Sequence, residues 1–221
     1  MSRVVPAVLT DNAGDLESMV RQAESFTDYV QMDIMDGQFV PSRSVTWRDL
    51  AGLRPRLRWE AHLMVKAPED YIEGFREAGA RRIIFHYEAT ATPDAVIVRI
   101  KKLGLEAGVA INPGTPVAAL RGLTGRVDSL LLLSVNPGFY GAKFVPEVLG
   151  KITELRRSHP GIEIGIDGGI KENNIAEVAG TGVDVIYVGS AIFLQPDPAR
   201  SFRRLSELAG KAPPSLLPRS S

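Results

Sequence analysis

Three residues with reactive side chains lie within or directly after apolar runs that have the character of buried strands. They are Asp33, His62 and Asp167. A buried carboxylate costs free energy unless it is paired, so a structural salt bridge and a reactive site are the two explanations. Successive residues of a strand alternate between its faces, which places Gln31 and Asp33 on one side. If that side lines an enclosed space, both can meet His62 and Asp167. A lone histidine is often merely packed, but its coincidence with two acids favours a reactive site.

A pair of glycine-containing segments follows the last two strand-like runs. Asp167 precedes Gly168 and Gly169, and a later apolar run precedes Gly189 and Ser190. Glycine allows unusual dihedrals and close approach of a ligand, and free backbone N–H groups bind anions. One such segment alone would more often be a simple turn. Two of them favour a phosphate site, with the Ser190 hydroxyl as a further donor.

Two methionines accompany the reactive groups. Met35 shares the strand face of Asp33, and Met64 follows His62 by two residues. Methionine usually fills irregular gaps in a core. Beside a reactive site the two side chains could instead form an apolar lid over the reacting centre, and both explanations stay open.

The elements that must position these residues are short β-branched runs separated by amphipathic stretches. The predicted strands are 4–9, 29–34, 58–64, 82–86, 106–111, 129–133, 163–166 and 185–188. The predicted helices are 15–25, 47–53, 68–78, 93–103, 117–123, 146–157, 173–179 and 198–209. Continuous apolar strands, such as the run of four leucines from Leu130 to Leu133, are typical of a parallel sheet that is buried on both faces.

Eight strand–helix pairs predict one α/β domain, a closed (β/α)₈ TIM barrel over residues 1–210. The alternative is an open doubly wound sheet, but no GxGxxG segment follows the first strand. In TIM barrels the reactive residues come from the carboxyl ends of the strands, and the loops after strands seven and eight often hold phosphate. Residues 211–221 are rich in proline and serine, which predicts a disordered tail.

The composition excludes several other classes of protein. Lysine plus arginine (26) balances aspartate plus glutamate (26), so no basic field attracts nucleic acid or anionic lipid. The chain has no cysteine, which excludes thiolate catalysis and thiolate metal ligands. No segment has the apolar length of a signal peptide or a membrane span. We therefore expect a cytoplasmic enzyme or binding protein, and a homo-oligomer stays open.

Taken together, these segments resemble the ribulose-phosphate 3-epimerase family. The resemblance runs from about residue 5 to residue 193 in the family's order. The matching segments begin at Met32, Phe39, His62, Phe85, Asn112, Ser134, Asp167 and Gly189 and read MDIMDG, FVP, HLMV, FHYEA, NPGTP, SVNPGF, DGGI and GSAIF. The resemblance implies a TIM barrel of the ribulose-phosphate-binding type.

The resemblance also implies an activity and its residues. The family interconverts D-ribulose 5-phosphate and D-xylulose 5-phosphate by inverting carbon three, which lies next to a ketone. Asp33 would accept the proton on one face and Asp167 would donate one on the other. A divalent metal ion (Zn, Fe, Mn, Co or Mg) would be bound by Asp33, His62 and Asp167. The residues expected around the phosphorylated ketose are His62, Met35, Met64, Gly138, Phe139, Tyr140, Gly141, Gly168, Gly169, Gly189 and Ser190.

The chain departs from the family pattern at four positions near this site. Gln31 replaces the first metal-binding histidine, Ala7 replaces a serine of the first strand, Leu133 replaces a methionine, and Tyr140 interrupts a glycine pair. A carboxamide oxygen is a harder and weaker ligand than imidazole, so we expect weaker transition-metal binding or a preference for Mg or Mn. Without a metal, Gln31 could donate a hydrogen bond to the developing oxyanion.

Two alternatives to the family reaction follow from these departures. The first is a sibling epimerase that acts on another ketose phosphate with an altered or absent metal. The second is a barrel that binds a phosphorylated metabolite without catalysis, although a pure binder has no need of two acids beside an anion. Decarboxylases of related barrels use a lysine between acids at a strand end. Lys66 lies beyond its strand and is interpreted as a surface charge.

Overall fold

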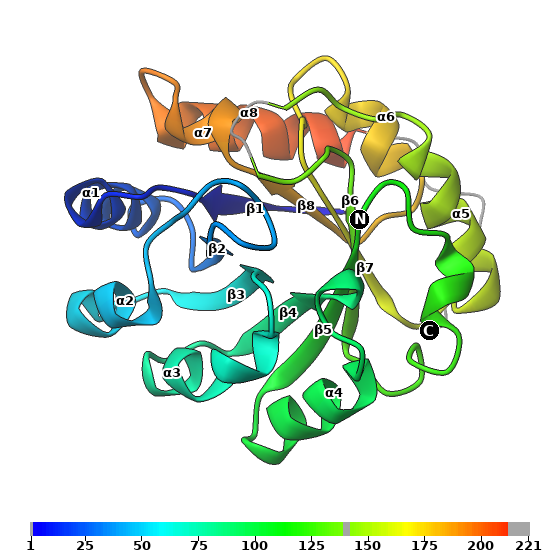
Figure 1. Cartoon of the computed structure of the whole chain (residues 1–221). Coiled ribbons are helices and arrows are strands. Elements are labelled where there is room, and N and C mark those ends of the chain that lie inside the picture. The colour runs from blue at the N-terminus through cyan, green and yellow to red at the C-terminus, as the bar shows by residue number, and fades with distance from the viewer. Residues whose placement is uncertain (1, 139–141, 212–221) are drawn as a thin grey trace.

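The computed structural model describes residues 2–138 and 142–211. Eight parallel strands form a closed barrel in the order of the chain, and helices surround it (Figure 1). The strands are β1 Arg3–Val8, β2 Tyr29–Met35, β3 Arg58–Met64, β4 Arg82–His86, β5 Glu106–Ile111, β6 Ser129–Leu133, β7 Glu163–Asp167 and β8 Val185–Val188. The predicted TIM barrel is confirmed, and the predicted strands agree with the observed ones to within one residue at either end.

The outer layer consists of helices of uneven length. The α-helices are α1 Ala13–Ala23, α2 Trp47–Leu53, α3 Ile72–Glu77, α4 Pro93–Lys102, α5 Val148–Ser158, α6 Ile175–Gly180, α7 Ser190–Phe193 and α8 Pro198–Gly210. Three 3₁₀ turns add η1 Pro68–Asp70, η2 Tyr87–Ala89 and η3 Val117–Leu120. None of the helices within the described ranges is long and apolar enough to cross a membrane. Of the predicted tail 211–221, all but Lys211 lies outside the described residues.

Three parts of the helical prediction were wrong. The stretch 68–78 divides into η1 and α3, because Tyr71 between them bonds back to Pro68 with the three-residue spacing of a 3₁₀ turn. The stretch 117–123 forms only η3, and Gly122 beyond it has φ +84°, which does not continue a right-handed helix. The four-residue helix α7 was not predicted.

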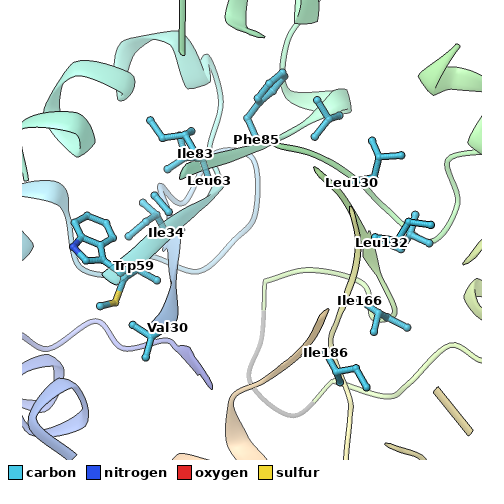
Figure 2. Packing of buried hydrophobic residues seen from close by; sticks show 14 of the residues in the cluster. Val30, Ile34, Trp59, Leu63, Ile83, Phe85, Leu130, Leu132, Ile166 and Ile186 are labelled. Carbon is cyan, nitrogen blue, oxygen red and sulfur yellow. The ribbon is translucent and has the colours of Figure 1, made fainter. Parts of the chain in front are cut away.

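Apolar side chains on alternate strand positions pack outward against the helices. Figure 2 shows Val30, Ile34, Leu63 and Ile166 among the buried residues that point away from the barrel axis. Their neighbours along the chain therefore point into the barrel, as the alternation of a strand requires. A second, smaller apolar cluster, which includes Leu131, fills the inside of the barrel.

Two strand glycines make room for large side chains inside the barrel. A Cβ atom on Gly165 of β7 would lie 2.7 Å from Cε2 of Tyr187, and one on Gly108 of β5 would lie 2.7 Å from side-chain atoms of Ile84 and Ser129. Any larger residue would therefore force these neighbours to move. The inside of the barrel is thus filled rather than open on the side of β5 and β7.

A charged group built around the buried Arg82 and Glu60 occupies the opposite end of the barrel from the strand ends discussed above. Arg82, the first residue of β4, donates to Glu163 at 2.6 Å and to Glu60 at 3.3 Å. It also pairs with Glu106 at 2.6 Å. The hydroxyl of Tyr29 donates to Glu60 at 2.8 Å. We call this group the amino-end cluster: it consists of Tyr29, Glu60, Arg82, Glu106 and Glu163, and burial together with the nearby Glu60 carboxylate raises the pKa of the Tyr187 hydroxyl beside it.

Candidate active site

Three strands bring four polar side chains together near the carboxyl end of the barrel. β2 supplies Gln31 and Asp33, β3 supplies His62, and β7 ends with Asp167. Nε2 of Gln31 donates to Oδ1 of Asp33 at 3.0 Å and to Oδ2 of Asp167 at 2.8 Å. Nδ1 of His62 lies 2.9 Å from Oδ1 of Asp33 and 3.5 Å from Oδ2 of Asp167. We call these four residues the carboxyl-end cluster; the sequence-based expectation that Gln31 and Asp33 meet His62 and Asp167 agrees with their geometry.

Burial and mutual charge shift the protonation of this cluster. Burial raises the pKa of Asp33 to about 6, and the neighbouring Asp167 carboxylate acts in the same direction against hydrogen bonds from His62 and Gln31. For His62, burial disfavours the imidazolium, but hydrogen bonds to Asp167 and Asp33 outweigh it and raise the pKa to about 9. A carboxyl whose pKa is raised toward neutrality is suited to exchange a proton with a substrate.

A pocket opens directly above the two acids. Asp33 and Asp167 line it, whereas His62 lies behind them and is fully buried. Met35 and Met64 also line the pocket and pack together with Val40. Both methionines therefore lie at the mouth beside the acids, where the sequence predicted either core packing or a lid.

Glycine backbone forms another part of the pocket wall. Gly168 and Gly169 have φ values of +112° and +66°. A Cβ on Gly168 would lie 2.5 Å from the side chain of Val135, and one on Gly169 would lie 2.9 Å from the backbone nitrogen of Phe144. The conformation therefore requires glycine on both grounds.

Further residues predicted around the phosphate occupy the same pocket. Gly189 and Ser190, at the start of α7, line it together with Gly138. Phe139, Tyr140 and Gly141, the other members of the predicted set, lie outside the described residues.

Comparison with known proteins now places the chain in a family. The family model described as "Ribulose-phosphate 3 epimerase family" matches residues 3–193. The chain belongs to this family. It is 40% identical over 218 residues to a ribulose-phosphate 3-epimerase of Aquifex aeolicus, covering 94% of this chain and 97% of that protein. It is 38% identical over 202 residues to the Escherichia coli K12 protein of that name, covering 88% and 90%.

Solved structures of other proteins share the barrel. A 3-hexulose-6-phosphate synthase from Salmonella typhimurium has a TM-score of 0.74 at 18% identity and covers 96% of this chain and 100% of that one. A 3-keto-L-gulonate-6-phosphate decarboxylase from Vibrio cholerae has a TM-score of 0.75 at 17% identity and covers 96% and 99%. At these identities the likeness shows the fold alone. Lys66, weighed above as a decarboxylase lysine, is exposed.

Three of the four departures from the family pattern fall in the described site. Ala7 and Leu133 are buried and line the pocket, which makes part of its wall apolar. Gln31 joins the two acids through one amide group. The fourth departure, Tyr140, lies outside the described residues.

Within the described ranges, Asp33, His62 and Asp167 form a group that could hold a metal ion. Each offers one ligand atom, and these atoms lie within 4.8 Å of one another. The 2.9 Å and 3.5 Å separations between the imidazole nitrogen and the acid oxygens suit ligands that share one small cation. Beside them, the buried Oε1 of Gln31 has no hydrogen-bond partner among the described residues. Gln31 turns its NH₂ group toward both acids, so this oxygen becomes a further donor once the amide turns over, and the residues fit a metal.

His86 and Glu88 lie behind His62, and the sequence had suggested no role for either residue. Nε2 of His62 lies 3.0 Å from Nε2 of His86, and Nδ1 of His86 lies 3.4 Å from Oε2 of Glu88. Burial lowers the pKa of His86 to about 4. The available signal was a histidine and an acid two residues apart directly after the apolar run of β4.

Proposed function

We propose that this protein interconverts D-ribulose 5-phosphate and D-xylulose 5-phosphate by moving a proton at carbon three. The observation that supports this proposal is the placement of two acids, Asp33 and Asp167, on strands β2 and β7 of one barrel. Both line the same pocket, and a single amide of Gln31 joins them. Inversion of a carbon needs one group on each face, which two such acids supply.

The proposed reaction uses the two acids in opposite roles. The carboxylate of Asp33 takes the proton from carbon three, and the electron pair of that C–H bond forms the enediolate with the neighbouring ketone. Asp167 then donates a proton to the opposite face of carbon three, and the ketone re-forms. The raised pKa of Asp33, about 6, lets it accept a proton and release it again near neutral pH.

The glycine wall of the pocket is the proposed phosphate site. Gly168, Gly169 and Gly189 offer backbone close to the pocket without side chains, and Ser190 adds a hydroxyl. Backbone N–H groups at the ends of strands and the start of a helix suit a phosphate. A substrate anchored there would extend its sugar carbons toward the two acids.

A divalent cation is the proposed cofactor. Asp33, His62 and Asp167 would hold it, with Oε1 of Gln31 as a further oxygen donor. When bound, such an ion polarises the ketone and stabilises the negative charge of the enediolate. Three oxygen donors and one imidazole form a harder set than one with two imidazoles, which favours Mg²⁺ or Mn²⁺ over Zn²⁺.

A second candidate substrate is another ketose phosphate. The observation that favours it is the apolar wall made by Ala7 and Leu133, which offers no hydroxyl to a sugar. A substrate with a different hydroxyl pattern near this wall would lose less binding energy there. Both candidates use the same acids and the same phosphate site.

The test is epimerisation of D-ribulose 5-phosphate in D₂O, followed by NMR. Metal-stripped protein is compared with protein given Mg²⁺, Mn²⁺, Zn²⁺ or Fe²⁺. We expect xylulose 5-phosphate to form with deuterium at carbon three, and one ion to restore the highest rate. Tight binding without deuterium exchange under any condition would overturn the epimerase proposal. Exchange with other ketose phosphates alone would support the second substrate.

A further inference from the structure

Two histidine rings meet edge to edge behind the two acids. His62 and His86 are both fully buried, and their rings lie 22° from coplanar. The 3.0 Å contact joins the Nε2 atoms of both rings. A hydrogen bond between two ring nitrogens needs a hydrogen on one and a lone pair on the other. The orientation of that bond decides whether Nε2 of His62 carries a hydrogen, and so which nitrogen of His62 can give one up.

Glu88 decides the orientation. Its Oε1 accepts from the backbone N–H of Asn112 at 2.9 Å and from the hydroxyl of Thr115, and its Oε2 faces Nδ1 of His86 at 3.4 Å. A carboxylate can only accept, so the hydrogen of His86 is on Nδ1. The Nε2 atom of His86 then has the lone pair, and Nε2 of His62 donates to it. It follows that Nδ1 of His62, the atom facing Asp33 and Asp167, is the one left to serve the site.

The loop after β5, whose residues Asn112 and Thr115 donate to Glu88, is itself anchored. Nζ of Lys151, from α5, donates to the carbonyl oxygens of Asn112 at 3.3 Å, Pro113 at 2.6 Å and Thr115 at 2.5 Å. The ring of Phe39 packs over His86 with 4.9 Å between centroids. The hydrogen bonds that lead from the loop to His62 are therefore supported at their outer end by Lys151 and covered at His86 by Phe39.

We propose that Glu88 and His86 are positioning residues that keep a hydrogen on Nε2 of His62, so that Nδ1, which faces Asp33 and Asp167, is the nitrogen that gives up its hydrogen when a cation binds. This inference rests on the proposed function for its catalytic meaning. Outer partners that fix the tautomer of a ligand histidine typically change metal affinity or activity by about 10- to 100-fold when they are removed. A purely structural role for the chain would instead affect only the stability of the fold.

The sharpest variant is Glu88→Gln, which has nearly the same shape. The backbone N–H of Asn112 must still face an oxygen, so the new amide would turn its NH₂ group toward Nδ1 of His86. His86 would then accept at Nδ1 and donate from Nε2. The bond between the rings would reverse, so Nε2 of His62 would accept and Nδ1 would have to keep its hydrogen. The substitution is therefore expected to prevent Nδ1 of His62 from binding a cation, although both histidine rings remain in place.

The matched control is Thr115→Val, which removes one hydrogen bond from the same carboxylate and leaves its acceptor character toward His86. We expect Glu88→Gln to weaken Co²⁺ binding by about 10- to 100-fold and to lower kcat with KM within about twofold. Thr115→Val should keep the wild-type Co²⁺ affinity and absorption spectrum. Affinity is measured by chelator competition on protein without substrate.

An NMR measurement on the wild-type protein tests the inference without any variant. In ¹⁵N-labelled protein, the hydrogen of neutral His86 should be on Nδ1, and in Glu88→Gln on Nε2. A wild-type His86 with its hydrogen on Nε2 would overturn the inference, as would a Glu88→Gln protein that is less stable yet binds Co²⁺ normally. If the tautomer and Co²⁺ results hold but the wild type does not epimerise, the positioning role stands and the proposed function fails.

Discussion

The barrel contains two polar clusters, each built around buried residues, that differ in how their charges are compensated. In the amino-end cluster, the guanidinium of Arg82 faces Glu60, Glu106 and Glu163, and its charge is permanent. In the carboxyl-end cluster, no arginine or lysine among the described residues is hydrogen-bonded or ion-paired to Asp33 or Asp167. Their partners are the neutral amide of Gln31 and an imidazole.

This difference separates structural from reactive charge. Full burial raises the pKa of Glu60, and the charge of Arg82 acts against that rise. Asp33 and Asp167 instead line a pocket, and of their partners the imidazole can release or take up a proton and the amide can make way for a cation. A permanent counter-ion suits a cluster that closes the barrel, whereas a neutral bridge leaves the pocket acids without a fixed positive charge. The predictions below test this division from the largest expected effect to the smallest.

Removing either acid of the carboxyl-end cluster should stop turnover with little change in the fold. Asp33→Asn and Asp167→Asn each keep the side-chain shape but remove a proton-transfer group, so kcat should fall by about 10²- to 10⁴-fold or more. Initial rates with D-ribulose 5-phosphate measure this, and calorimetry with inorganic phosphate should show binding unchanged. Near-normal turnover in either variant would remove that residue from the proposed mechanism.

Removing the counter-ion of the amino-end cluster should lower the stability of the fold and leave turnover unchanged. Arg82→Met leaves Glu60 buried beside acids without its cation, which typically destabilises a protein by about 3–5 kcal/mol. Urea unfolding measures the loss, and kcat of the folded fraction should be kept. The control is Arg99→Met, which breaks an exposed pair with Glu73 and should cost about 1 kcal/mol or less. Equal losses in the two variants would contradict a structural role for the amino-end cluster.

Replacing the neutral bridge should change the metal preference of the site. Gln31→His supplies a second imidazole, so affinity for Zn²⁺ should rise by about 10- to 100-fold while affinity for Mg²⁺ does not. Competition with a chromogenic chelator measures both. If neither metal affinity nor rate changes, Gln31 does not belong to the metal site.

The smallest effect is expected from one hydrogen bond of the amino-end cluster. Tyr29→Phe removes the hydroxyl that donates to Glu60 at 2.8 Å but leaves Arg82 in place. The free energy of unfolding should fall by about 1 kcal/mol, with kcat and KM unchanged. A loss of activity at constant stability would show that the two clusters are coupled through the barrel.

Much of this architecture could be predicted from the sequence because buried parallel strands have a distinct pattern. The run Leu130–Leu133 and the spacing of the other apolar runs were sufficient to predict where the strands lie. Alternation along β2 sufficed to place Gln31 and Asp33 on one side. Short elements such as η3 and α7 were harder, since one or two turns depend on tertiary contacts more than on their own periodicity.

The partners of the clusters were beyond sequence reasoning for a geometric reason. Strands of a barrel are staggered, so a residue's height depends on the shear between neighbouring strands. Several strands begin with a charged residue, but only the register shows that Arg82 pairs with Glu60 across β3 and β4. For the same reason the sequence could not show the hydrogen bonds that join His62, His86 and Glu88, because they cross from one strand to the next.

The amide bridge also has a consequence for how the protein acquires its activity during synthesis. Gln31 and Asp167 are separated by 136 positions along the chain. Contacts of such high sequence separation form late, because a long loop must close first. A nascent chain that has emerged only as far as β6 contains Gln31, Asp33 and His62 but lacks the second acid. Completion of the barrel and the onset of catalysis should therefore coincide, and partly translated chains should be inert toward sugar phosphates.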